Sequence, residues 1–374
     1  MAERSNKLLR RLDRWAGVPL AATSALLRLG RKPVADPPQR VGFLCLGAIG
    51  DLLLLSACIA ALRERLPRAT FVLLTSRANA QAAALVPGLD ITAAFGVRQV
   101  PAMSAWLRAQ RLDLLVDSSQ WARLGALLCN LSGAGSTVGF ATPGQCRAWG
   151  YSRTAQHSDR RHEVENFLAL GRTLYPDLTG APRLQLPPQP TTTAADLLAR
   201  VGVTDPPERC VCLHMWPSGS QAWLKEWPAA HWDALIRRLA ERGFRVCLTG
   251  GPRDATRVTA FLREHPDCPA VSLAGTGSLS DLACLFAHIA AVVAVNTGTM
   301  HLAALTGAPT VALNGPTNPL RWGPIGPRVR SLLPHRGPCA YLNLGFEYPR
   351  PPRPCLDALP VEDVLDALHS LEIF

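Results

Sequence analysis

The sequence predicts an α/β protein made of two Rossmann-like domains whose parallel sheets face a central cleft. Three observations support this fold class. The chain has 374 residues, which suits two domains at roughly 150 residues each. Short apolar runs typical of buried parallel strands alternate with segments of helical periodicity. A proline-rich stretch at residues 182–190 divides the alternation into two series. The composition, 48% hydrophobic and 18% charged, excludes a disordered or fibrous protein.

The first series follows a proline-rich break at residues 33–38. Residues 41–46 form a continuous apolar run that ends at Gly47, as expected for a strand buried on both faces. Strands alternating with helices imply a parallel sheet with right-handed crossovers. The other predicted strands are 70–75, 112–117 and 136–140, and the predicted helices are 51–65, 77–86 and 119–132.

The second series repeats this architecture. Its predicted strands are 209–214, 244–249, 270–273, 291–295 and 309–313, and its predicted helices are 228–242, 254–264, 278–288 and 299–306. Residues 323–355 are predicted to be a loop, and 361–371 a last helix whose first-turn acids suit the helix dipole. The predicted organisation is therefore an extension (1–40), a first domain (41–185), a linker (186–208), a second domain (209–335) and a loop with a C-terminal helix (336–374).

Positive charge is concentrated at the N-terminus. The formal net charge is +11, and residues 1–40 hold nine basic and three acidic residues, which is +6 of that total. The apolar stretch 15–27 is about half the ~20 residues needed to span a bilayer, and its setting does not fit a signal peptide. Basic positions alternate with apolar ones at helical spacing, as in helices that lie in a membrane interface; the apolar residues are Leu8, Leu9, Leu12 and Trp15.

Two hypotheses account for this extension. Residues 1–32 either attach to an anionic membrane surface, which would place the protein in the cytoplasm on the inner face of the cytoplasmic membrane, or form a helix packed on the first domain. Nucleic acid is not expected as a partner, because no recognition module and no interleaving of aromatic and basic residues is present.

The 11 cysteines are odd in number, scattered, and contain no Cys-x-x-Cys pair. We therefore expect reduced thiols that mostly serve as small core residues. Cys210 and Cys212 fall on one face of a predicted strand, which could indicate a metal, but burial in the sheet is the better interpretation. No metal site is predicted.

Functional residues are expected where strands end and helices begin, because open parallel sheets bind ligands at the carboxyl ends of their strands. In the first such turn, Gly47 and Gly50 let the backbone approach a ligand closely, and Asp51 lies at the start of a helix. Asp51 is either a helix cap or a functional carboxylate. The spacing Gly-x-x-Gly-Asp is not the dinucleotide fingerprint, so a nicotinamide site is disfavoured.

Three turns of the second domain contain polar and glycine residues. After strand 291–295, Asn296 or Thr297 can cap a helix that opens with Gly298, and its free N–H groups suit a diphosphate. His301 is either a phosphate donor or a structural histidine. Ser218 and Ser220 could hold phosphate oxygens beside Lys225. The last turn, with Gly250, Gly251 and Asp254, either lines a nucleoside pocket or is an ordinary tight turn.

Taken in order, five segments resemble the lipopolysaccharide heptosyltransferase family, glycosyltransferase family 9. The resemblance spans about residues 41–330. The segments are Leu46-Gly-Ala-Ile-Gly-Asp51, Trp223-Leu-Lys-Glu-Trp-Pro228, Thr249-Gly-Gly-Pro252, Asn296-Thr-Gly-Thr-Met-His-Leu-Ala-Ala304 and Gly315-Pro-Thr-Asn-Pro319.

The resemblance implies a GT-B fold and an inverting glycosyl transfer without metal or cofactor. The implied donor is a nucleotide sugar, typically ADP-heptose, and the implied acceptor is a lipid-linked saccharide, the lipid A–core. Asp51 would be the base toward the acceptor hydroxyl, and Lys225 would bind phosphate. The diphosphate helix would use Thr297, Gly298, Thr299, Met300 and His301.

One residue departs from the family pattern. Many members have Asp-Thr-Gly where this chain has Asn296-Thr297-Gly298, and an asparagine can cap a helix but cannot carry charge. This leaves two alternatives open beside heptosyl transfer: a transferase of cell-envelope polysaccharide synthesis that uses another nucleotide sugar, and a non-catalytic nucleotide-sugar-binding protein. A Rossmann oxidoreductase is disfavoured because the fingerprint and its ribose-binding acid are absent.

Overall fold

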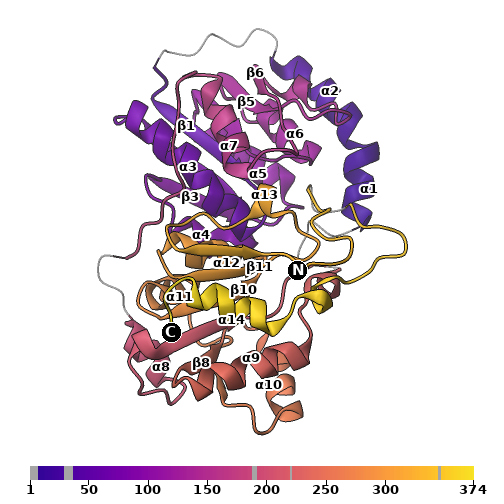
Figure 1. The fold of residues 1–374 in the computed structure, drawn as a ribbon. Helices are drawn as coiled ribbons and strands as arrows, with labels where there is room; N and C mark the ends of the chain where they lie inside the picture. The colour runs from indigo at the N-terminus through magenta and orange to yellow at the C-terminus, as the bar shows by residue number, and fades with distance from the viewer. Residues whose placement is uncertain (1–6, 29–36, 188–191, 220, 344–346) are drawn as a thin grey trace. The chain divides into compact units, whose positions relative to one another are not determined.

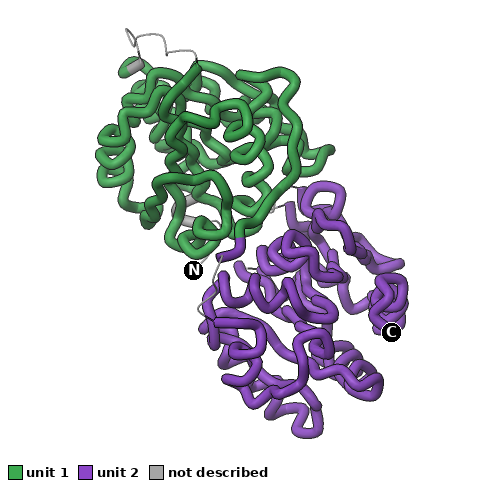
Figure 2. The backbone as a smooth tube through the Cα atoms, turned by 90° about the vertical axis from the view of Figure 1, so that its left-hand side faces the viewer, with its two compact units in different colours: residues 1–185 green, residues 186–374 purple. Residues whose placement is uncertain are grey.

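The computed structural model describes residues 7–28, 37–187, 192–219, 221–343 and 347–374 (Figure 1). It divides into two compact units, residues 1–185 (unit 1) and 186–374 (unit 2), which Figure 2 shows in different colours. Each unit is built around its own six-stranded parallel sheet, so the predicted fold class of each is confirmed.

The sheet of unit 1 has the order β3-β2-β1-β4-β5-β6. In this Rossmann order the strand sequence reverses between β1 and β4, and sheets of this kind typically bind ligands at that reversal point. β1 is central because its residues are apolar and buried; Phe43 pairs with Leu73 of β2 and Val116 of β4. The strands are β1 (Arg40–Cys45), β2 (Thr70–Ser76), β3 (Ile91–Phe95), β4 (Leu114–Asp117), β5 (Ser136–Phe140) and β6 (Arg153–Ala155).

The helices of unit 1 are α3 (Ile49–Arg65), α4 (Ala80–Ala83), α5 (Val100–Ala109), α6 (Arg123–Leu131) and α7 (Glu163–Arg172). Of these elements, β3, β6, α5 and α7 were not predicted. The two strands form the edges of the sheet and are partly exposed, so they lack the continuous apolar run of a buried strand. The helix predicted at 77–86 begins as predicted, with a 3-10 turn (Arg77–Asn79) that continues into α4, but it ends at Ala83 rather than at residue 86.

The N-terminal helices α1 (Lys7–Trp15) and α2 (Gly17–Ala25) belong to unit 1, and α2 packs along α6 (Figure 1). Asp13 accepts a hydrogen bond from the Arg123 backbone N–H at 2.8 Å and pairs with the Arg123 guanidinium at 3.1 Å. Asn130 of α6 donates to the Ala21 carbonyl at 3.0 Å. The predicted packing on the first domain is therefore confirmed, and membrane attachment through the outer face of the same helices stays a prediction. No helix in the described part of the chain combines the length and hydrophobicity that a membrane crossing requires.

Unit 2 repeats the Rossmann order as β12-β11-β10-β7-β8-β9, with its reversal between β7 and β10. Val293 of β10 pairs with Leu213 of β7 and Val311 of β11, and all three are fully buried. The strands are β7 (Cys210–His214), β8 (Arg245–Leu248), β9 (Ala270–Ser272), β10 (Ala291–Val295), β11 (Thr310–Leu313) and β12 (Val329–Leu332). The helices are α8 (Ala194–Ala199), α9 (Ala229–Glu241), α10 (Ala255–Glu264), α11 (Leu279–Phe286), α12 (Gly298–Leu305), α13 (Pro319–Trp322) and α14 (Val361–His369).

Two segments of unit 2 have more structure than predicted. Residues 186–208, expected to be a linker, contain α8, which Thr193 caps by accepting from the Asp196 N–H. Residues 323–355, expected to be a loop, contain the edge strand β12. None of the residues of β12 is buried, so its sequence lacks the apolar run of a buried strand.

The prediction of reduced thiols is wrong for Cys339 and Cys355, which form a disulfide. The segment that carries Cys339 folds back on the loop after β11, where Ala340 donates to the Gly315 carbonyl at 3.0 Å. Cysteine spacing along the sequence does not reveal such a tertiary arrangement. The other nine cysteines are free, and all of them except Cys146 and Cys268 are buried, as expected for core residues.

Candidate functional site

The turn after β1 places Asp51 at the third position of α3, where its side chain is buried with 5% exposure. Its Oδ2 atom accepts a hydrogen bond from the Ala48 backbone N–H at 2.6 Å, so Asp51 does cap the helix. Gly47 is needed for this, because a Cβ on it would lie 2.3 Å from Asp51 Oδ2. Gly50 lies inside the first turn of α3 and is buried. Gly47 therefore makes room for the Asp51 carboxylate, and the close approach of a ligand to Gly47 and Gly50 stays a prediction.

The same carboxylate contacts Gln120, a residue that sequence reasoning missed. Gln120 follows β4, the strand next to β1, and its Nε2 atom lies 3.3 Å from Asp51 Oδ1. Its side chain is buried, with 6% exposure. A polar run directly after a predicted buried strand was the available signal, since both turns lie at the reversal point of the sheet.

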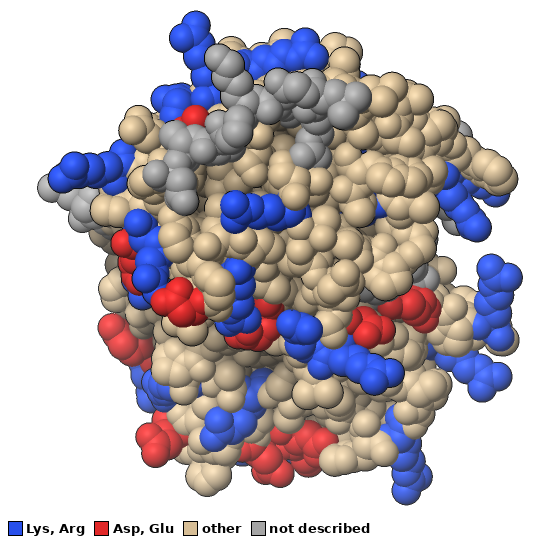
Figure 3. All heavy atoms as spheres, turned by 90° about the horizontal axis from the view of Figure 1, so that it is seen from above, with Lys and Arg blue, Asp and Glu red and all other residues tan. Residues whose placement is uncertain are grey.

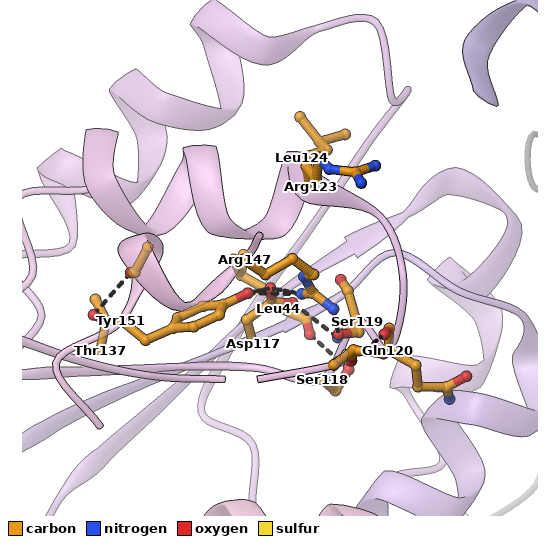
Figure 4. Close-up of polar contacts among 12 residues, drawn as sticks. Leu44, Asp117, Ser118, Ser119, Gln120, Arg123, Leu124, Thr137, Arg147 and Tyr151 are labelled. Atoms are coloured by element: carbon orange, nitrogen blue, oxygen red, sulfur yellow. Dashed lines mark hydrogen bonds and ion pairs between the residues drawn. The ribbon is translucent and has the colours of Figure 1, made fainter. Parts of the chain in front are cut away.

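A buried cluster of Asp117, Arg147 and Tyr151 supports the turn that carries Gln120 (Figure 4). The Arg147 guanidinium and the Tyr151 hydroxyl both donate to Asp117 Oδ2, at 2.7 and 2.6 Å. Burial, reinforced by the negative charge of Asp117, raises the pKa of Tyr151 well above its ordinary value, so Tyr151 stays a protonated donor. Arg147 also donates to the Ser119 carbonyl, which ties the cluster to the turn.

The β1 turn is held from its other side by Asn79. This fully buried residue donates to the Gly47 carbonyl at 3.1 Å. Burial, together with the negative charge of Asp51, raises the pKa of the Cys45 thiol at the end of β1 to about 12. The Cys45 thiol is therefore neutral at physiological pH.

In unit 2, the turn between β10 and α12 differs from its prediction in one respect. Thr297 occupies the N-cap position, but neither it nor Asn296 caps the helix with its side chain. Instead, the Asn296 amide nitrogen donates to Asn314 Oδ1 at 2.6 Å and to the Trp322 carbonyl at 2.8 Å, and these two bonds orient the side chain toward its tertiary partners. Thr297 Oγ1 is buried and has no hydrogen-bond partner within the described part of the chain.

The rest of this turn opens α12, whose first-turn N–H groups have no intrahelical acceptor, as in any helix. Gly298 and Thr299 are partly exposed there, whereas Met300 and His301 are buried. The N-terminus of α12 lies at the reversal point of the unit 2 sheet, beside the turn that follows β7. An anion could be held there by backbone N–H groups and the helix dipole.

The β7 turn carries Ser218, which is exposed, while Ser220 lies outside the described residues. Lys225 ends a 3-10 turn (Ala222–Lys225) and is partly buried. His214, at the end of β7, was not singled out from the sequence. Its Nδ1 atom lies 3.2 Å from Thr249 Oγ1, and burial lowers its pKa to about 4, so the ring is neutral at physiological pH.

The turn after β8 is closed by its own carboxylate. Asp254 Oδ2 accepts a hydrogen bond from the Gly251 N–H at 2.9 Å, and a Cβ on Gly250 would lie 2.6 Å from the Asp254 Cβ. These contacts are those of an ordinary tight turn, and they leave the nucleoside role of the three residues a prediction. Within the described residues, no group of three or more His, Cys, Asp or Glu side chains could hold a metal ion.

The structure thus gathers the sequence-predicted residues into two groups at strand ends. In unit 1, Gly47, Gly50 and Asp51 meet Gln120 between β1 and β4. In unit 2, the Lys225 segment and the α12 N-terminus follow the adjacent strands β7 and β10, with the Gly250 turn one strand further. Two Rossmann units, each with polar residues at its reversal point, define the class of the GT-B proteins.

Comparisons with known proteins assign the family. Residues 100–343 match the model of glycosyltransferase family 9 (heptosyltransferase), so the chain belongs to this family. It is 41% identical over 120 residues to lipopolysaccharide heptosyltransferase 1 of Pseudomonas aeruginosa, a match that covers 31% of this chain and 32% of that protein. It is 28% identical over 235 residues to lipopolysaccharide heptosyltransferase 1 of Escherichia coli K12, covering 62% of this chain and 69% of that protein. For the first of these relatives, the match spans about a third of its length.

Solved structures agree on the fold. The structure of E. coli ADP-heptose lipopolysaccharide heptosyltransferase II aligns with a TM-score of 0.71 at 20% identity, covering 89% of this chain and 98% of that one. A family 9 glycosyl transferase from Veillonella parvula aligns with a TM-score of 0.72 at 18% identity, covering 89% and 97%. The GT-B fold predicted from the sequence resemblance is therefore confirmed.

Proposed function

We propose that this protein transfers a heptose from ADP-heptose to the lipopolysaccharide core or a related lipid-linked saccharide, with inversion and without a metal ion. The observation that carries the proposal is the buried carboxylate of Asp51 at the reversal point of unit 1, in a chain that belongs to family 9. The curated relatives are named lipopolysaccharide or lipooligosaccharide heptosyltransferases. One fold relative is E. coli heptosyltransferase WaaC with ADP.

Asp51 is the proposed general base. A hydroxyl of the acceptor donates its proton to the Asp51 carboxylate as its oxygen attacks the anomeric carbon from the face opposite the nucleotide. The new bond joins the acceptor oxygen to the anomeric carbon, and the bond from that carbon to the diphosphate breaks. The helix-capping bond from Ala48 engages Oδ2 and thereby fixes the carboxylate in the turn.

The leaving diphosphate gains negative charge, and we assign its stabilisation to groups of unit 2. The N–H groups and dipole of α12 and the Lys225 ammonium supply positive charge, as a divalent cation does in other transferases. The buried Thr297 hydroxyl is available for the same anion, since no described residue accepts or donates a hydrogen bond to it. Lys225 and α12 are in this way the proposed donor side of the reaction.

The position of Asn296 weakens the non-catalytic alternative. That alternative was motivated by the missing carboxylate, but the Asn296 amide has a structural task, because it donates to two oxygens, on Asn314 and Trp322. A carboxylate could not make these donations. An asparagine at 296 is therefore compatible with transfer, and no separate function is needed to explain it.

The proposed partner of the N-terminal helices is an anionic membrane surface, and residues 1–6 and 29–36 of this segment lie outside the described residues. The outer face of α1 and α2 exposes large apolar side chains beside Arg11 and Arg14. Trp15 is 78% exposed and Leu12 53% exposed. On the face shown in Figure 3, Lys and Arg side chains lie scattered among uncharged residues and several Asp and Glu side chains. Attachment would hold the enzyme beside a membrane-embedded acceptor at the cytoplasmic face.

Two measurements test the proposal. Calorimetric titration with ADP, UDP, GDP and CMP without divalent metal should show ADP binding that Lys225→Ala weakens. Transfer from ADP-heptose to a heptose-free lipid A–core acceptor should be lost by about 10²–10⁴-fold in Asp51→Asn, the usual contribution of a general base. Because asparagine still offers an oxygen to the Ala48 N–H, this variant should keep the fold. Preference for another nucleotide would rule out ADP-heptose, and near wild-type transfer by Asp51→Asn would rule out the base.

A further inference from the structure

We infer that Gln120 is a positioning residue for the Asp51 carboxylate, and that the buried Asp117–Arg147–Tyr151 cluster holds it in place. The inference rests on the proposed function, because it assigns Gln120 a role in the proton transfer to Asp51. It adds a residue that lies outside the five family-like segments of the sequence.

The two oxygens of the Asp51 carboxylate have different donors. Oδ2 accepts from the Ala48 backbone N–H at 2.6 Å, and Oδ1 faces the Gln120 amide nitrogen at 3.3 Å. Asp51 and Gln120 are 5% and 6% exposed, so water does not replace the amide easily. Donors on both oxygens restrict rotation of the carboxylate about its Cβ–Cγ bond, which keeps its basic lone pairs aimed in one direction.

The backbone of the Gln120 turn is fixed by contacts on successive residues. The Gln120 carbonyl accepts from the Thr142 hydroxyl at 2.7 Å, and the Ser119 N–H donates to Asp117 Oδ1 at 2.8 Å. The Ser118 hydroxyl donates to the Leu44 carbonyl of β1 at 2.7 Å. Figure 4 shows the Gln120 side chain directed away from the Asp117 cluster. The turn is therefore anchored on one side and presents the amide on the other.

The Asp117–Arg147–Tyr151 cluster is closely packed, and two glycines make room for it. Gly125 of α6 leaves room for it, since a Cβ there would lie 2.0 Å from Asp117 Oδ2. Gly139 of β5 leaves room for the Tyr151 ring, which a Cβ would approach to 2.3 Å. Asp117 has no exposed surface, and its two donors on Oδ2 compensate the cost of burying its charge.

A glutamine suits this position chemically. Its amide donates to the carboxylate without adding charge, so the carboxylate remains available as a proton acceptor. A lysine or arginine would form an ion pair that disfavours protonation of Asp51 during the reaction, and a glutamate would repel it. Gln120 is thus a neutral hydrogen-bond donor, as the proposed proton transfer to Asp51 requires.

The test compares variants of the full-length protein in transfer assays with ADP-heptose and a lipid A–core acceptor. Gln120→Met keeps the length of the side chain and removes the donor, and Gln120→Glu keeps its shape and replaces the donor by a charge. Each is measured alone and combined with Asp51→Asn. Tyr151→Phe removes one donor from the supporting cluster. Gln110→Met, at a glutamine that directly follows α5 and precedes β4, is the matched control.

We expect Gln120→Met to lower kcat about tenfold, the size of one hydrogen bond to a charged group, with little change in donor KM. Gln120→Glu should lower kcat further, and Tyr151→Phe should lower it less. In the Asp51→Asn background, Gln120→Met should have no additional effect, because a residue that acts through Asp51 has nothing left to position. Gln110→Met should match the wild type.

Three outcomes would overturn the inference. A Gln120→Met enzyme with wild-type kcat would remove the role, and an equal loss of kcat with and without Asp51 would show that Gln120 only stabilises the fold. If Gln120→Met does not fold, wild-type kcat in Gln120→Glu would likewise remove the role. If the wild-type protein transfers no sugar, the proposed function itself fails, and this inference fails with it. If the wild type is active, a failure of the Gln120 variants to behave as expected contradicts the positioning role alone.

Discussion

Gly47 and Asp51 are in such close contact that a methyl group on Gly47 would lie 2.3 Å from Asp51 Oδ2. The turn and the carboxylate are therefore one structural unit. A side chain at position 47 would displace the Asp51 side chain rather than the backbone, because the obstructing atom is the end of a side chain.

From this contact we predict that Gly47→Ala folds but loses most of its transfer activity. The Asp51 carboxylate must leave the Ala48 N–H, which costs about 1 kcal/mol, the usual value of a lost helix cap. Thermal unfolding and kcat measured together check this. Gly96→Ala is the control, since a Cβ there meets its nearest atom at 3.4 Å. Equal activity of Gly47→Ala and Gly96→Ala would contradict the role of the contact.

A second prediction concerns Asn296. Asn296→Asp should destabilise the protein by about 1–3 kcal/mol, because a carboxylate would face the Trp322 carbonyl with no proton to donate. Urea unfolding of the variant at neutral pH gives the free energy. Asn296→Ala, which removes both donations without adding charge, separates lost hydrogen bonds from repulsion. An Asn296→Asp protein as stable as the wild type would show that the amide is not required there.

Protonation of His214 predicts a dependence of stability on pH. Burial lowers the pKa of this histidine to about 4, against an ordinary value of 6.5, so the unfolded chain binds a proton that the folded protein excludes between these values. Stability from this group is complete above about pH 6.5 and is lost as pH falls toward 4, by about 3 kcal/mol in all. Asp254, whose charge opposes the shift, limits the effect.

The measurement for His214 is the free energy of unfolding of the wild type and of His214→Gln from pH 4.5 to 7.5. Both proteins contain the same carboxylates, so the effects of carboxylate titration cancel in the difference between the two free energies of unfolding. The free energy of unfolding of the wild type, relative to that of His214→Gln, should decrease as the pH falls. A constant difference across this range would mean that His214 does not change its protonation on unfolding.

The features that could be predicted from the sequence are those that depend on residues close together in the chain or on apolar periodicity. The turn with Gly47 and Asp51 is local, and the buried strands have continuous apolar runs, so both were predicted. Gln120 was missed because its contact with Asp51 joins residues 69 apart, and only the order of β1 and β4 brings them together. The side-chain cap predicted for Asn296 or Thr297 is not formed: Thr297 is the N-cap residue without a capping bond, and Asn296 donates to Asn314 and Trp322, which only the folded unit brings near it.

The last prediction concerns the outer face of the N-terminal helices. We expect the protein to bind vesicles that contain anionic lipid and to bind neutral vesicles weakly, because each basic residue near an anionic surface contributes about 1 kcal/mol. Trp15→Ser should weaken binding, since Trp15 is 78% exposed and has an apolar ring suited to the interface. Trp223→Ser, which removes a tryptophan of unit 2 that is 50% exposed, should leave it unchanged. Co-sedimentation with vesicles measures both variants. Equal losses for the two would show a nonspecific effect of exposed tryptophan, and no loss for Trp15→Ser would mean that α1 serves only to pack on α6.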